Sequence, residues 1–104
     1  MPTRVIAGKF FDGPWALTFA PGLLRHKPGV YLIAEKRGMR FLDMDESDNV
    51  GAHVANHERR SCWTKHASES DLVVYVLDVD SPGGRFQQGV EAREGLPSLP
   101  CYPK

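Results

Sequence analysis

Residues 29–44 of this chain read GVYLIAEKRGMRFLDM. An apolar run at residues 29–34 and a second segment at residues 39–44, apolar except for Arg40 and Asp43, lie on either side of a charged turn that contains Gly38. Short apolar runs separated by a polar, glycine-containing turn are typical of two antiparallel strands. The sequence therefore predicts a β-hairpin in this region, and the rest of the fold is built around it.

On the N-terminal side, residues 15–19 alternate large and small side chains, which is the period of a half-buried strand. Residues 1–28 are therefore predicted to place one further strand in front of the hairpin. Pro21 and Gly22 interrupt this pattern, and a short helical turn is expected at Leu23.

Beyond the hairpin the sequence predicts, in order, a helix, a polar loop, a strand and a second helix, over residues 48–59, 61–70, 72–77 and 85–94. Ser47 is a good N-cap for the first helix, and Val50 and Val54 lie one turn apart on its apolar face. The strand reads LVVYVL, a run typical of a strand buried on both faces. We therefore predict one α/β (α+β) domain over residues 1–104, with a small three- to four-stranded, mainly antiparallel sheet flanked by helices.

Charge limits the classes of partner. The 104 residues include 13 Lys and Arg and 13 Asp and Glu, which gives a formal net charge of zero. Tight nucleic-acid binding normally needs a surplus of basic residues that replace phosphate counterions. Local contacts with nucleic acid are still predicted for four basic residues, Arg40, Arg59, Arg60 and Lys65.

The location of the protein is predicted from its N-terminus and its cysteines. The first residues contain no apolar run long enough for a signal peptide or a membrane helix, so no membrane contact is expected. Cys62 and Cys101 form no CxxC pair. We therefore expect reduced thiols, no disulfide framework and a cytoplasmic protein.

Several segments together resemble the GIY-YIG endonuclease domain over residues 29–103. The matching segments, in chain order, are Gly29-Val30-Tyr31, Glu46-Ser47-Asp48-Asn49-Val50, Asn56-His57, Glu91 and Pro100-Cys101-Tyr102-Pro103. The resemblance implies a GIY-YIG-like fold. It also implies that Tyr31 positions the attacking water and that Glu91 binds one divalent metal ion, Mg²⁺ or Mn²⁺.

The chain departs from this pattern at the positions that carry the chemistry. Asp43 and Asp45 replace the tyrosine and glycine of the family's second triplet, and His53 stands where the family has an arginine. That arginine neutralises charge that develops on the phosphorus, and losing one such donor typically costs about 10²–10³ in rate. Because no arginine lies between Arg40 and Arg59, the catalytic site is predicted to be degenerate.

The sequence therefore predicts a non-catalytic binding or interaction module that needs no cofactor and contacts an unknown protein or nucleic acid. One alternative is a metal-dependent nuclease that uses Tyr31, His53, Glu91 and Asp43 with Mg²⁺ or Mn²⁺. The residues also have plain structural interpretations. Tyr31 can be a packed strand aromatic, and Glu91 can belong to a solvated helix face.

A second alternative is an interaction domain stabilised by zinc. His53 and His57 are four residues apart on one predicted helix, and Cys62 and His66 have the same spacing. With Asp43 or Asp45 they would supply the imidazole, thiolate and carboxylate ligands that zinc prefers. If the site is instead a remnant, Asp43 is expected to face His53 and to form a hydrogen-bonded pair that fills the former cleft.

Overall fold

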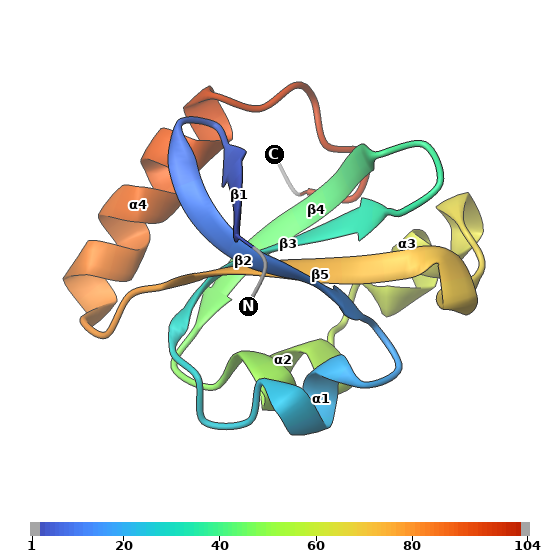
Figure 1. Cartoon of the computed structure of the whole chain (residues 1–104), viewed down its shortest axis with the longest axis horizontal. Coiled ribbons are helices and arrows are strands. Elements are labelled where there is room, and N and C mark those ends of the chain that lie inside the picture. The colour runs from blue at the N-terminus through green and yellow to red at the C-terminus, as the bar shows by residue number, and fades with distance from the viewer. Residues whose placement is uncertain (1–2, 103–104) are drawn as a thin grey trace.

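The computed structural model describes residues 3–102, which form a five-stranded antiparallel sheet with helices on both faces (Figure 1). The spatial order of the strands is β1-β2-β5-β3-β4. The strands are β1 (Thr3–Ile6), β2 (Lys9–Ala16), β3 (Gly29–Glu35), β4 (Arg40–Ser47) and β5 (Leu72–Asp78). The helices are α1 (Ala20–Leu23), α2 (Val50–Ala55), α3 (Arg60–His66) and α4 (Pro82–Glu94), with a 3₁₀ turn at Glu69–Asp71.

The predicted hairpin is confirmed as β3 and β4, which pair in antiparallel register with Tyr31 opposite Asp45. The predicted strand at residues 72–77 is also confirmed, because β5 lies antiparallel to β3 in the middle of the sheet. Its first five residues are all buried, as expected for a strand covered on both faces.

The expected number of strands was too small, because the N-terminal region forms a hairpin of its own. β2 begins at Lys9 and ends at Ala16, and Ala7 and Gly8, both with positive φ, connect it to β1. The prediction of a strand continuing to Phe19 is wrong. Phe19 is exposed and directly precedes α1, which supplies the expected helical turn.

Each face of the sheet has its own hydrophobic core. The first lies under α1, α2 and α3 and includes Val50, Val54 and Trp63, all fully buried. The second includes Val30 and Leu32 and lies under α4. Val50 and Val54 therefore face the sheet as the helical spacing predicts.

The predicted helix over residues 48–59 is shorter than expected. α2 ends at Ala55, and its N-cap is Asn49 rather than Ser47, because the Asn49 side chain accepts a hydrogen bond from the Ala52 N–H. A second helix, α3, occupies the segment that was predicted to be a polar loop. Fully buried Trp63 anchors this helix, whose other residues are exposed or half-buried.

Two glycines allow close approaches between elements. A Cβ atom on Gly29 would collide with the carbonyl oxygen of Leu77 in the neighbouring strand β5. A Cβ atom on Gly51 would collide with the backbone of α1 at Leu24. The glycine of the Gly-Val-Tyr segment thus has a packing role that is independent of any catalytic one.

Helix α4 begins at Pro82, three residues earlier than the predicted helix. Ser81 is its N-cap, and the Ser81 side chain accepts a hydrogen bond from the N–H of Gly84. It ends at Glu94, with Gly95 at the predicted cap position. Phe86 and Val90 lie on its exposed side. Within residues 3–102, no helix is long and apolar enough to cross a lipid bilayer.

Candidate functional site

The candidate site is a cluster of polar side chains between α2, α3 and the β3–β4 hairpin. At its base lies Tyr31, which is fully buried and whose hydroxyl is 2.7 Å from Nδ1 of His53 on α2. Burial raises the pKa of Tyr31, and the negative charges of Asp45 and Asp43 raise it further. The phenol therefore stays protonated at neutral pH and can donate its hydrogen bond to His53.

Asp45 lies opposite Tyr31 in the sheet register and binds His57. Nδ1 of His57 accepts a hydrogen bond from the backbone N–H of Arg59 at 3.0 Å, so Nε2 carries the proton. The Nε2–H group donates a hydrogen bond to Oδ2 of Asp45, with 2.9 Å between the two atoms. Burial alone would raise the pKa of Asp45. The hydrogen bonds from His57 and the Glu46 backbone, together with the positive charge of Arg59, outweigh burial and hold this pKa below its usual range.

Asp43 is buried, with 1% of its surface exposed, and accepts more hydrogen bonds than Asp45, the other carboxylate of the cluster. Arg59 donates to both its oxygens, from Nε at 2.9 Å and Nη2 at 3.1 Å. The indole N–H of Trp63 donates to it at 2.7 Å. The predicted pairing of Asp43 with His53 is therefore wrong. Asp43 is held by Arg59 and Trp63, and His53 by Tyr31.

The carboxylates of Asp43 and Asp45 also cover part of the open edge of the sheet, where β4 pairs with a strand on only one side. Oδ1 of Asp43 accepts from the N–H of Met44, and Oδ1 of Asp45 accepts from the N–H of Glu46. Arg59 donates to the carbonyl of Met44. These backbone groups are the ones that an added strand would use, so the cluster protects the edge against pairing with another chain.

Arg59 is the residue of the cluster whose place in it was not predicted from the sequence. It was predicted only as a nucleic-acid contact, but its guanidinium bonds to Asp43 and, at 3.1 Å, to Asp45. Burial would lower the pKa of Arg59, but its hydrogen bonds and ion pairs with the two aspartates raise it, so the side chain stays charged. Because α2 ends at Ala55, the chain turns back and brings this arginine under the hairpin.

Glu91 is not part of the cluster. It lies on α4, which packs on the opposite face of the sheet from Tyr31 (Figure 1). Its exposed carboxylate is 2.7 Å from Nζ of Lys9 and accepts a hydrogen bond from Gln87. Those hydrogen bonds lower the pKa of Glu91. The structure thus brings Tyr31, His53 and Asp43 to one face of the sheet and leaves Glu91 on the other.

The other basic residues that were predicted to contact nucleic acid have separate local roles. Arg60 bonds to Glu69 and to the carbonyl of Val54. Arg40 donates to Nδ1 of His66, and Lys65 is exposed.

The predicted zinc ligands fall into two groups. Asp45, His53 and His57 form one group. Cys62 and His66 form the other with Cys101, which was not predicted as a ligand. In each group the ligand atoms lie within 4.8 Å of one another.

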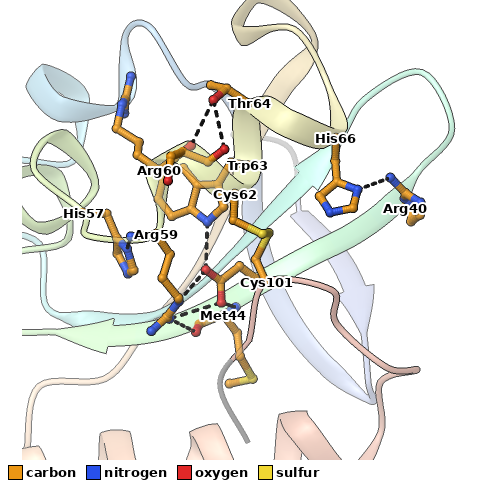
Figure 2. The surroundings of a disulfide bond; sticks show 12 residues. Arg40, Met44, His57, Arg59, Arg60, Cys62, Trp63, Thr64, His66 and Cys101 are labelled. Atoms are coloured by element: carbon orange, nitrogen blue, oxygen red, sulfur yellow. Dashed lines mark hydrogen bonds and ion pairs between the residues drawn. A yellow bond between two sulfur atoms is a disulfide. The ribbon is translucent and has the colours of Figure 1, made fainter.

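The expectation of free thiols is contradicted. Cys62 of α3 and Cys101 of the C-terminal segment are joined by a disulfide, with their Cα atoms 5.8 Å apart (Figure 2). The two cysteines are 39 residues apart in the sequence, and folding brings them together at the β4 edge. There the N–H of Cys101 also bonds to the carbonyl of Leu42.

Comparison with protein-family models, curated proteins and solved structures finds no match for this chain. The resemblance to GIY-YIG domains therefore remains a prediction from the residues quoted above. One of them, Pro103, lies outside the described residues.

The lowered pKa of Asp45 predicts an acid-dependent loss of stability. Because the folded pKa lies below the unfolded value of about 3.9, the stabilisation is fully present above that value. It is lost as the pH falls through the folded pKa. The melting-temperature difference between the wild type and Asp45→Asn should be large at pH 6 to 7 and shrink below about pH 4. A difference that stays constant over this range would contradict the prediction.

Proposed function

We propose that this chain is a non-catalytic binding domain with a GIY-YIG-like arrangement, in which the residues of the former active-site face bond to one another. The observation that carries the proposal is the buried Tyr31 hydroxyl, whose partner is His53 at 2.7 Å. A tyrosine that positions an attacking water must contact that water, and this hydroxyl is enclosed by protein.

The electrostatics of the cluster support the same proposal. The GIY-YIG nucleases that the sequence resembles use a divalent cation and a free arginine close to the phosphate. Here the guanidinium of Arg59 is bound to Asp43 and Asp45, so its charge is already neutralised by two carboxylates. Glu91, the predicted metal ligand, is on the other face of the sheet in an ion pair with Lys9.

A surface suited to binding lies on the α4 side of the domain. An apolar groove between α4 and the end of β4 is lined by Met44, Phe86, Val90 and Tyr102, among others. The Phe86 side chain is exposed, with 66% of its surface accessible. Exposed apolar patches with a polar rim typically mark contacts with other molecules.

The experiment is a cleavage and binding assay on the purified chain. Labelled single- and double-stranded DNA and RNA are incubated with the protein and Mg²⁺ or Mn²⁺, beside an active metal-dependent nuclease. We expect the nucleic acids to stay intact. Binding, followed by the fluorescence anisotropy of the labelled strands, should be weak and should decrease strongly with added salt. Metal-dependent cleavage that disappears in Glu91→Ala would overturn the proposal.

A second candidate function, a nuclease with a remodelled metal site, is favoured by one observation. The ligand atoms of Asp45, His53 and His57 lie within 4.8 Å of one another, close enough to share a divalent cation. The same assay separates this candidate from the first. Cleavage that survives Glu91→Ala but is lost in His53→Ala would assign the metal to this group.

A further inference from the structure

We propose that Cys62, His66 and Cys101 form a zinc site in the reduced protein, so that one pair of cysteines holds the C-terminal segment either by a disulfide or by a metal ion. The ligand atoms of these residues lie within 4.8 Å of one another. Ligand atoms on one tetrahedral zinc are roughly 3.3–3.8 Å apart, given zinc–sulfur bonds of about 2.3 Å and zinc–nitrogen bonds of about 2.0 Å. The two sulfurs are bonded to each other in the disulfide and move apart on reduction, and His66 lies within 4.8 Å of both, so small side-chain movements bring the three ligands to the required spacing.

Two of the ligands come from a single helix. Cys62 and His66 are four residues apart on α3, so their side chains project from the same side of it. Figure 2 shows His66 on the same helix as Cys62 and beside Arg40 of β4. Cysteine and histidine are the usual zinc ligands, and this pair needs no movement of the helix to face one ion.

The third ligand is held in place by contacts other than the disulfide. The backbone N–H of Cys101 donates to the carbonyl of Leu42 at 2.8 Å. Cys101 is buried in the core that contains Trp63, and its neighbour Leu99 is buried in the second core. After reduction, these contacts keep the Cys101 thiol close to Cys62, which lowers the entropic cost of forming the site.

One ring nitrogen of His66 is a hydrogen-bond acceptor in the structure. Arginine can only donate hydrogen bonds, so the contact of 3.1 Å from Arg40 Nη2 shows that Nδ1 of His66 accepts and carries no proton. This nitrogen has a lone pair available for a metal ion. Arg40 is exposed and can turn to solvent when zinc takes its place.

Reduction of the Cys62–Cys101 disulfide requires a dithiol reductant, the class of reagent that a reducing cytoplasm supplies. The reductant transfers two electrons and two protons to the disulfide and is itself oxidised to a disulfide, leaving two free thiols. Zinc then binds both sulfurs and displaces one proton from each thiol to the solvent. His66 supplies the third ligand, and a water molecule completes the tetrahedron.

The test uses Co²⁺ as a spectroscopic substitute for Zn²⁺ on the full chain, with and without prior reduction. Reduced protein should bind one equivalent of Co²⁺, show thiolate-to-cobalt charge-transfer absorption, and lose it when Zn²⁺ is added. Oxidised protein should not show this absorption. Cys62→Ser and Cys101→Ser should abolish it.

His66→Ala should weaken zinc binding by at least about a hundredfold, because it removes a direct ligand rather than an outer partner. His26→Asn is the matched control and should bind as the wild type does, because His26 is exposed and belongs to neither group of ligands. Retention of the disulfide and of the circular dichroism spectrum in oxidised His66→Ala shows that this variant folds.

Two results would overturn the inference. One is reduced wild-type protein without charge-transfer absorption. The other is equal affinity in His66→Ala and the wild type. Neither result depends on whether the chain cleaves nucleic acid, so this inference and the proposed function fail separately.

Discussion

Val54→Asp should remove most of the stability of the domain. Val54 is fully buried in the core that α2 forms with the sheet, beside residues such as Tyr31 and Trp63. A carboxylate there would have to enter an apolar site as an unpaired charge, or the helix would have to leave the sheet. We expect a loss of about 4–5 kcal/mol or more in the free energy of unfolding, most of the stability of a small domain.

The measurement is urea denaturation or thermal melting, and the same loss should lower the melting temperature by roughly 20 °C or more. Ala52→Asp is the matched control, since it puts the same charge on the same helix at an exposed position. That variant should stay within about 0.5 kcal/mol of the wild type. Equal melting temperatures for the two variants would show that α2 does not pack as described.

The elements that could be predicted from the sequence have a local periodic pattern. The hairpin has an apolar first strand followed by a charged turn, and β5 is apolar over nearly its whole length. Val50 and Val54 repeat at helical spacing and face the core. In each case the residues that define the element are also the ones that folding buries, so one local signal determines both.

The elements that were missed lack such a pattern. Helix α3 has one fully buried side chain, Trp63, among polar neighbours, so its amphipathic signal is carried by a single residue. In β2 the buried side is marked by Phe11, while Phe10 next to it is exposed, and Gly13 and Pro14 interrupt the run. Tertiary contacts rather than local sequence determine these elements.

For the candidate site, the sequence indicated some of the residues but not their pairing, since Asp43 rather than Tyr31 was expected to face His53. Tyr31 lies opposite Asp45, and His53 on the next helix reaches the Tyr31 hydroxyl. The positions of Arg59 and of Cys101 depend on where α2 ends and on how the C-terminal segment returns to β4. Neither has a signal in local sequence. The disulfide was missed for the same reason, since pairing across 39 residues cannot be inferred from spacing.

Asp43→Ala should be the second strongly destabilising substitution, at about 3–5 kcal/mol. The Asp43 carboxylate is the acceptor for the guanidinium of Arg59 and for the buried indole N–H of Trp63. Removing it leaves a largely buried cation and a buried donor without their shared partner, and buried groups left unpaired carry the full cost of desolvation. Asp48→Ala removes an exposed carboxylate nearby and should change stability by less than about 0.5 kcal/mol.

A double-mutant cycle with Arg59→Ala separates the ion pair from the rest of the loss. Because Arg59 is the group left unpaired in Asp43→Ala, the double variant should be more stable than the sum of the two single losses predicts. The coupling energy should be at the upper end of the roughly 0.5–3 kcal/mol found for interacting pairs. Additive losses would mean that Arg59 turns to solvent when Asp43 is absent. Trp63 and the β4 edge would then account for the whole effect, and the guanidinium would be free to contact a phosphate, contrary to the closed site proposed above.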